Sequence, residues 1–282
     1  MWRRRITLAT VATVLLISTV PGAAEGVTVV AAGDIACADE PCPAQIDTAR
    51  VARRQAPDAA LTLGDHQYER GALKEFRASY DPTWGKMRGL TFPTPGNHEY
   101  DTPHANGYFA YFHKRAHGPR GFYSFSLDTW QVLSFNSERA IDRQRDWARN
   151  RLRSGTGTCE LAYWHRPRWS SSRGNGGSDA SARWWQILYR HGVDVVLNGH
   201  AHQYERFGKL DPDGRLDPDG IREFVVGTGG RSLYRFGRPA TGSKARIRRF
   251  GVLKLELRAA SYTWRFLSRN GVVLDRGETN CR

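Results

Sequence analysis

Short apolar runs, separated by amphipathic or turn-rich segments, recur along most of the chain. Five of these runs end in Asp, Asn or His beside a glycine or another turn residue, and they occupy residues 27–34, 61–65, 95–99, 161–165 and 195–202. Apolar runs of this length, bounded by turn residues, are typical of buried strands. If these strands share one rim of a sheet, their ends bring carboxylate, amide and imidazole groups together. Such a rim can hold two metal ions.

The same pattern predicts a chain that first alternates between strand and helix and then becomes largely strand. The expected strands lie near 27–32, 59–63, 90–94, 121–128, 131–136, 160–164 and 193–197, and later near 203–210, 221–227, 250–257, 261–268 and 272–276. The expected helical segments lie near 43–55, 70–88, 142–153 and 180–190, with Asp142 as the cap of the third. This order predicts a single α/β domain in which two mixed β-sheets are flanked by helices.

The first 24 residues have the pattern of a signal peptide. Three arginines at 3–5 precede an apolar stretch at 6–20, and small residues at 21–24 favour cleavage after Ala24. We therefore expect an exported, extracellular protein whose mature domain is 25–282, with the general and the twin-arginine routes both open. The alternative is an uncleaved N-terminal anchor, although the apolar stretch is short for a membrane span. No later segment is apolar enough to cross a bilayer.

The formal net charge of +14 falls to +11 without the leader, because three arginines leave with it. A basic surface attracts anionic substrates and polyanions in general. The basic residues are scattered along the chain rather than grouped on one helix, and no nucleic-acid-binding motif is present. We therefore expect no specific binding of nucleic acids.

The chain contains four cysteines, and an even number in an exported protein indicates two disulfides. Three pairings are possible. Cys37 and Cys42 lie five residues apart and can close a small loop, and Cys159 and Cys281 then tie a strand to the C-terminal tail. A role for cysteine as a metal ligand is disfavoured because no Cys-x-x-Cys pair occurs.

The polar residues at the strand ends are weak signals when each is taken alone, since single Asp, Asn and His residues are most often caps, turn residues or core residues. His200 and His202 alternate, so on an extended segment they point the same way. The specific signal is the joint occurrence of the whole set. The set consists of Asp34, Asp65, Asn97, His165, His200 and His202.

These residues, with their neighbours, resemble the motifs of the calcineurin-like metallophosphoesterases. The motifs read Asp34, Gly64-Asp65-His66-Gln67-Tyr68, Gly96-Asn97-His98-Glu99, His165 and Gly199-His200-Ala201-His202. Tyr68, three residues after Asp65, makes the second motif look like that of the purple acid phosphatases and their small bacterial relatives. One departure is Ala36, which stands where a glycine two residues after the first aspartate is common. The resemblance implies the metallophosphoesterase sandwich of two mixed sheets.

The resemblance also implies a centre of two metal ions. Its first ion is held by Asp34, Asp65, Tyr68 and His202, and its second by Asp65, Asn97, His165 and His200, so that Asp65 bridges them. A phenolate with carboxylates suits ferric iron, whereas imidazoles with an amide suit a divalent ion such as zinc, manganese or ferrous iron. The alternative for Tyr68 is a buried aromatic ring that only packs.

The implied activity is that of an acid phosphatase acting on small phosphomonoesters, in which a metal-bound hydroxide attacks phosphorus. His98 faces the substrate in this family pattern and stabilises the transition state or protonates the leaving group; alternatively, it orients a ligand. His66, His104 and Arg231 are weaker candidates for substrate contact. Two rival functions remain open, namely a phosphodiesterase that uses the same metals and a non-catalytic secreted protein that binds phosphate or polyanions.

Overall fold

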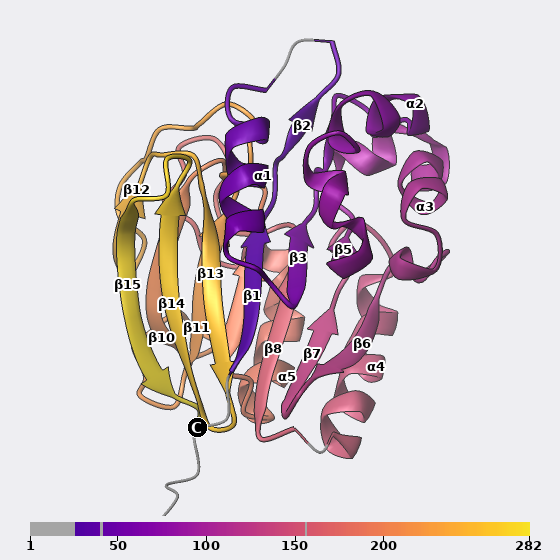
Figure 1. Cartoon of the computed structure of the whole chain (residues 1–282). Helices are drawn as coiled ribbons and strands as arrows, with labels where there is room; N and C mark the ends of the chain where they lie inside the picture. The colour runs from indigo at the N-terminus through magenta and orange to yellow at the C-terminus, as the bar shows by residue number, and fades with distance from the viewer. Residues whose placement is uncertain (1–25, 40–41, 156) are drawn as a thin grey trace, which may run out of the picture.

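The computed structural model describes residues 26–39, 42–155 and 157–282, so the predicted leader lies outside the described residues. Two large β-sheets lie face to face, with helices on their outer faces and around one end (Figure 1). This arrangement confirms the predicted sandwich of two mixed sheets. In the described part of the chain, no helix combines the length and the apolar character that spanning a membrane requires.

The first sheet has six strands in the order β15-β14-β13-β1-β3-β5. Their bounds are Val27–Ala32 for β1, Ala59–Leu63 for β3, Thr91–Thr94 for β5, Gly251–Arg258 for β13, Ser261–Ser268 for β14 and Val273–Asn280 for β15. β1, β3 and β5 are parallel, whereas β13, β14 and β15 add to β1 as an antiparallel meander. The carboxyl ends of three parallel strands therefore share one end of this sheet.

The second sheet has seven strands in the order β12-β10-β11-β9-β8-β7-β6. Their bounds are Tyr123–Leu127 for β6, Trp130–Ser134 for β7, Cys159–Trp164 for β8, Val195–Asn198 for β9, Tyr204–Leu210 for β10, Ile221–Val226 for β11 and Ser243–Ile247 for β12. β7, β8, β9 and β11 are parallel to one another. A small parallel pair, β2 (Ala36–Cys37) with β4 (Gln67–Tyr68), joins the loops that follow β1 and β3.

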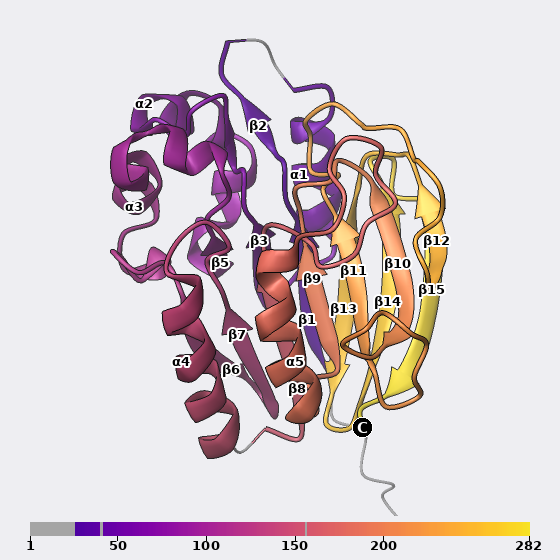
Figure 2. The ribbon, with the colours of Figure 1, turned by 180° about the vertical axis from the view of Figure 1, so that it is seen from behind.

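The longer helices cover the outer faces of the two sheets. α1 (Gln45–Arg54) lies against the first sheet, and α4 (Ile141–Ser154) and α5 (Ala182–Arg190) lie against the second (Figure 2). The main apolar core lies between the sheets, and a second cluster that includes Trp184 and Leu188 of α5 fills the space beneath the helices. Shorter helices are α2 (Leu73–Glu75), η1 (Phe76–Tyr80), η2 (Trp84–Leu90), η3 (His98–Asp101), η4 (Pro103–Ala105), α3 (Asn106–Phe112), η5 (His113–Ala116) and η6 (Asp179–Ser181).

Some local expectations need correction. Ala140 with φ 55° stands at the N-cap of α4, and Asp142 lies inside the first turn, where it forms an ion pair with Arg183. Asp142 is therefore not the cap. The helix α3 and the edge strand β12 were not predicted. The expected disulfides are confirmed, since Cys37 pairs with Cys42 and Cys159 with Cys281.

Candidate metal centre

Strand ends from both sheets meet at one end of the sandwich. Asp34 and Asp65 follow β1 and β3, Asn97 follows β5, and His165 and His200 follow β8 and β9. Asp34, Asp65 and His200 have positive φ values of 61°, 47° and 66°. Left-handed backbone at non-glycine residues costs free energy and is found preferentially at functional sites, where the surrounding structure imposes it. Here it turns the three side chains toward a common centre.

The first predicted ligand set is assembled around the phenol of Tyr68. Its Oη lies 2.9 Å from Oδ1 of Asp34, 3.0 Å from Oδ2 of Asp65 and 3.1 Å from Nε2 of His202. The same nitrogen of His202 is 3.2 Å from Oδ1 of Asp34. The four side chains are buried. One ion at the centre of this group can therefore be reached by all four donor atoms.

The second set is assembled around His165. Its Nε2 lies 3.2 Å from each of three atoms, namely Oδ2 of Asp65, Oδ1 of Asn97 and Nδ1 of His200. Asp65 Oδ2 is thus in contact with both sets, since the same oxygen also meets Tyr68. The structure brings together all seven residues that the sequence predicts as ligands.

The imidazoles are held from outside the cluster. Nδ1 of His165 donates to the carbonyl of Leu63 at 2.8 Å, and Nδ1 of His202 donates to that of Ser232 at 2.7 Å. A histidine that gives its outer N–H to a carbonyl presents the lone pair of its inner nitrogen, which is the arrangement found at metal sites. On the other side of the centre, Nη1 of Arg166 lies 3.0 Å from Nε2 of His200.

The cluster carries negative charge that requires a positive counterpart. Among the described residues, neither lysine nor arginine forms an ion pair with the buried carboxylates of Asp34 and Asp65. Burial alone would lower the pKa of His165, but the carboxylate of Asp65 raises it to about 10. Burial would raise the pKa of Asp65, but the positive charge of His165 holds it well below its usual range. A proton on His165 can therefore supply part of the positive charge that the carboxylates require.

Two further groups of the cluster have shifted pKa values, and each shift bears on metal binding. Burial, followed by the carboxylates of Asp34 and Asp65, raises the pKa of Tyr68 well above its usual value, so a phenolate forms there only beside a cation. Burial and the neighbouring charges of His165 and Arg166 lower the pKa of His200 to about 3, which keeps its imidazole neutral and able to bind a metal. Hard oxygen donors on one side and nitrogen donors with an amide on the other fit two cations.

His98 lies at the open side of the cluster and not among the ligands. Its backbone N–H donates to Oδ1 of Asp65 at 3.0 Å, and its Nε2 is 4.0 Å from Oδ2 of the same residue. The ring packs on Tyr68 with centroids 4.3 Å apart, and Nδ1 faces the carbonyl of Glu69 and, at 3.5 Å, the carboxylate of Asp101. The side chain is partly exposed, so a substrate at the cluster can reach it.

Glu99 is a structural residue of the site that the sequence did not single out. Its buried carboxylate accepts three backbone N–H groups, from Asp65 at 2.9 Å, His66 at 2.8 Å and Gly96 at 2.7 Å. It thereby fixes the loop after β3 to the loop after β5. The only signal in the sequence is its place in the third motif, which does not reveal that the carboxylate points inward.

The three weaker candidates differ in where they lie. His66 is fully buried beneath the site, with Nε2 2.7 Å from Oγ1 of Thr62 and its ring among aromatic side chains. A substrate does not reach that position, so a packing role replaces the predicted substrate contact of His66. His104 is exposed in η4, and its contact with substrate stays a prediction.

Arg231 lies beside the cluster. Its guanidinium is 4.9 Å from the ring centroid of Tyr68, and Nη2 is 2.6 Å from Oε1 of Glu69. Together with Cys37 and Asp39, these residues line a hollow of about 340 Å³. Contact between Arg231 and the substrate stays a prediction, and the location of Arg231 beside the cluster permits that contact.

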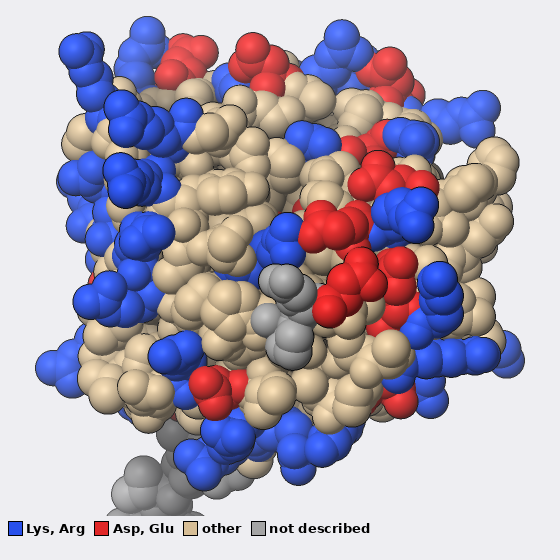
Figure 3. All heavy atoms as spheres, turned by 90° about the horizontal axis from the view of Figure 1, so that it is seen from above, with Lys and Arg blue, Asp and Glu red and all other residues tan. Residues whose placement is uncertain are grey.

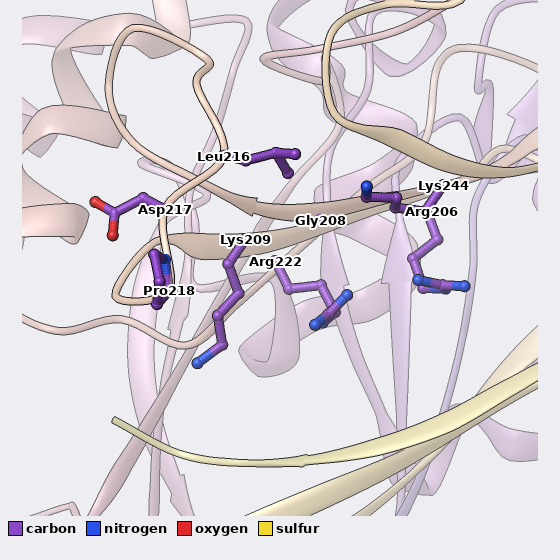
Figure 4. Close-up of a pocket in the computed structure, with 8 residues that line it drawn as sticks. All are labelled: Arg206, Gly208, Lys209, Leu216, Asp217, Pro218, Arg222 and Lys244. Carbon is purple, nitrogen blue, oxygen red and sulfur yellow. The ribbon is translucent and has the colours of Figure 1, made fainter.

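A larger hollow, of about 560 Å³, lies away from the cluster. It is lined by Arg206, Gly208, Lys209, Leu216, Asp217, Pro218, Arg222 and Lys244, from β10, β11, β12 and the loop between β10 and β11 (Figure 4). Because β11 is parallel to β9, Arg222 near its start lies toward the end opposite His200. Asp275 already forms a two-pronged ion pair with Arg206. This hollow is not part of the candidate centre.

Comparison with known proteins agrees with this geometry. A family model described as calcineurin-like phosphoesterase matches residues 27–204. Purple acid phosphatase 15 of Arabidopsis thaliana is 28% identical over 221 residues, which cover 62% of this chain and 40% of that protein. Probable purple acid phosphatase 20 of the same plant is 27% identical over 163 residues, which cover 48% of this chain and 38% of that protein. The chain thus spans about two fifths of the length of these relatives.

Solved structures show the same fold. The purple acid phosphatase PPD1 from yellow lupin seeds superposes with a TM-score of 0.71 at 20% identity, over 90% of this chain and 53% of that one. A dimetal phosphatase from Danio rerio superposes with a TM-score of 0.64 at 12% identity, over 92% of this chain and 100% of that one. GAP50, the anchor in the inner membrane complex of Plasmodium, superposes with a TM-score of 0.72 at 15% identity, over 92% of this chain and 90% of that one. Since the family model covers well over half of the sequence, the chain belongs to the calcineurin-like phosphoesterase family and resembles the purple acid phosphatases within it.

Proposed function

We propose that the chain is an extracellular phosphatase that hydrolyses small phosphate monoesters at a centre of two metal ions. The observation that carries the proposal is the position of one carboxylate oxygen. Oδ2 of Asp65 lies 3.0 Å from Tyr68 Oη and 3.2 Å from His165 Nε2, so it belongs to both donor groups. Two cations held about 3.5–4 Å apart by a shared ligand are the usual arrangement for displacement at phosphorus.

Each donor group favours a different ion. Asp34, Asp65, Tyr68 and His202 form an anionic, oxygen-rich group, for which we propose ferric iron. Asp65, Asn97, His165 and His200 form a group richer in nitrogen, for which we propose a divalent ion, either zinc, iron or manganese. When bound, the two ions supply Lewis acidity toward the phosphoryl oxygens and lower the pKa of a water molecule.

His98 acts on the substrate from the open side of the centre. The carbonyl of Glu69 and the carboxylate of Asp101 both face its Nδ1, so this nitrogen carries a proton. Nε2 then faces the cluster, and in the imidazolium form, in which Nε2 also carries a proton, it can donate a hydrogen bond to a phosphoryl oxygen or pass that proton to the leaving oxygen. We also propose that Arg231, whose guanidinium lies 4.9 Å from the ring centroid of Tyr68, binds a phosphoryl oxygen of the substrate.

The preference for monoesters and the extracellular location have separate support. The monoester proposal relies on Tyr68 and on the similarity to purple acid phosphatases. The two disulfides fit an oxidising compartment, as does the predicted leader at 1–24, which would leave a mature catalytic domain of 25–282.

The test compares the hydrolysis of an aryl phosphate monoester with that of a bis-aryl phosphate diester by protein loaded with iron and zinc, before and after chelation. We expect chelator-sensitive turnover that favours the monoester. A preference for the diester would instead establish the rival phosphodiesterase. No turnover of either ester by protein with two confirmed metals would support a binding role and contradict the proposal.

A further inference from the structure

Exposed apolar side chains are concentrated in one turn of the molecule. Among the described residues, six large apolar side chains are exposed, and three of them are consecutive: Val272 at 59%, Val273 at 41% and Leu274 at 39%. They lie at and just after the turn that joins β14 to β15. Isolated exposed apolar residues are ordinary in folded proteins, but a contiguous group marks an interaction site.

Two of these side chains share a recess. Val272 and Leu274 line a hollow of about 500 Å³ together with Leu233 and Phe250. Three arginines, Arg248, Arg249 and Arg269, line the same hollow. We refer to these seven residues as the basic-apolar patch. It combines exposed apolar side chains at a turn with the guanidinium groups of three arginines.

The arginines of the basic-apolar patch have no acidic partner in the part of the chain that the structure describes. Arg248 donates to the carbonyls of Tyr234 at 2.9 Å and Leu233 at 3.0 Å, and Arg269 donates to that of Pro43 at 3.2 Å. Arg249 likewise donates to a carbonyl, that of Arg248, at 3.1 Å. These partners are neutral, so three positive charges remain uncompensated. Seen from above, lysine and arginine side chains gather along the side of the molecule where β12 and β15 lie (Figure 3).

The basic-apolar patch lies at the same end of the sandwich as the metal centre. β1 and β14 both pair antiparallel with β13, so they run in the same direction, and Ser268 at the end of β14 pairs with Gly251. The turn after β14 is therefore level with Asp34, which follows β1 (Figure 1). Two strand spacings, or about 10 Å, separate β14 from β1 in the sheet. The loop that Arg248 holds also contacts the centre, because Tyr234 stacks on His202 with centroids 4.0 Å apart.

We propose that the basic-apolar patch docks the protein on an anionic phospholipid surface. Apolar side chains that project from a fold, flanked by cations, bind the boundary between headgroups and acyl chains, and the cations add attraction to acidic lipids. A soluble polyanion would use the three arginines but would gain nothing from Val272 and Leu274. The geometry favours the lipid surface for this reason. Docking in this way brings the metal centre close to the lipid headgroups.

The test is co-sedimentation with vesicles of phosphatidylcholine that contain phosphatidylglycerol, compared with vesicles of pure phosphatidylcholine. Residues 26–282 are used, because they contain both complete sheets and both disulfides, whereas the apolar segment 6–20 would itself bind bilayers. We expect binding to the acidic vesicles that is at least about tenfold stronger and that weakens with salt. The double variants Val272→Asp/Leu274→Asp and Arg249→Glu/Arg269→Glu should each lower that binding about tenfold or more.

Two matched controls separate the basic-apolar patch from general effects. Leu90→Asp/Leu216→Asp introduces the same two negative charges at side chains that are 41% and 55% exposed. Leu90 lies directly before β5 and Leu216 lies between the end of β10 and the start of β11, so both lie toward the end of the sandwich opposite the metal centre. Arg151→Glu/Arg153→Glu changes the net charge as much as the arginine variant does, in the last turn of α4. Both controls should keep the binding of acidic vesicles. Thermal unfolding of every variant verifies that it is folded.

Three results would overturn the proposal. The first is a wild-type protein that does not sediment with acidic vesicles. The second is an equal loss of binding in the control Arg151→Glu/Arg153→Glu, which would show that overall charge is responsible. The third is binding of inorganic polyphosphate and of vesicles that depends on Arg249 and Arg269 but is unaffected by Val272→Asp/Leu274→Asp, which would identify a site for polyanions.

Discussion

Oδ2 of Asp65 lies 3.2 Å from Nε2 of His165, and the same oxygen is 3.0 Å from the phenol of Tyr68. The two donor groups therefore meet at a single carboxylate, which follows β3 of the first sheet. Every member of the centre is positioned by a strand end or by the loop directly after one. The chemistry that we propose depends on this convergence.

Tyr68→Phe should remove the visible charge-transfer band of the iron-loaded protein, because Tyr68 is the phenolate ligand that we propose for ferric iron and phenylalanine has no oxygen to bind it. Tyr234→Phe is the matched control, since its ring stacks on His202 at 4.0 Å but Tyr234 is not among the proposed ligands. The control should keep the colour. The measurement is the visible spectrum at equal iron content, and an unchanged spectrum for Tyr68→Phe would rule out the tyrosinate.

His98→Ala should keep two metals per chain and lower kcat by about 10²–10⁴, the usual contribution of a positioned acid or base. The metals stay because the residue holds Asp65 through its backbone N–H, which alanine retains. Metal analysis and steady-state kinetics on the same preparation check both parts. Loss of metal in step with the loss of turnover would show that His98 acts on the ligands instead.

Glu99→Gln should lower the free energy of unfolding by about 2–3 kcal/mol, because the new amide N–H₂ would face a backbone N–H in place of an acceptor. The carboxylate oxygen that receives the N–H groups of both Asp65 and Gly96 is the critical one. Urea unfolding measures the change. Glu69→Gln, at an exposed ion pair with Arg231, is the control and should cost less than about 1 kcal/mol. Equal losses of unfolding free energy in the two variants would contradict the role of Glu99 in holding the loop after β3 to the loop after β5.

Glu160 gives a pH-dependent prediction far from the metal centre. Burial and the nearby carboxylate of Asp194 raise the pKa of Glu160 from 4.5 to about 7. The folded state therefore binds an additional proton between these pH values, and the free energy of unfolding falls as the pH rises through that interval. Glu160→Gln should be more stable than wild type at pH 8 and not at pH 4. Thermal unfolding of both proteins at pH 4 and pH 8 measures this. A stability difference between Glu160→Gln and wild type that is the same at both pH values would refute the raised pKa of Glu160.

The parts of the structure that the sequence predicts are those specified by local pattern. The strand ends at Asp34, Asp65 and His165 were visible because each follows a buried apolar run. Parallel pairing of β1 with β3 places Asp34 beside Asp65, whereas His165 reaches them because the second sheet packs face to face on the first. The strand β12 was missed because its residues alternate between exposed and half-buried positions at a sheet edge. Edge strands bury few apolar residues and so leave little pattern to detect.

The roles of His66 and Glu99 could not be predicted for a different reason. His66 follows the predicted ligand Asp65, which suggested contact with the substrate, and Glu99 follows His98 without any signal of its own role. The structure turns both inward, His66 against Phe112 and Glu99 against backbone N–H groups. These contacts join segments more than 30 residues apart along the chain, and no local pattern specifies them.

The most direct test of the two-metal centre is the number of metal ions per chain in the variant Asp65→Ala, measured by elemental analysis after loading with iron and zinc. Asp101→Ala is the control, since its exposed carboxylate lies beside His98 but outside both donor groups. We predict two ions per chain for the wild type and the control, and loss of both ions with loss of turnover for Asp65→Ala. Two ions retained per chain in Asp65→Ala would contradict the shared carboxylate and the centre built on it.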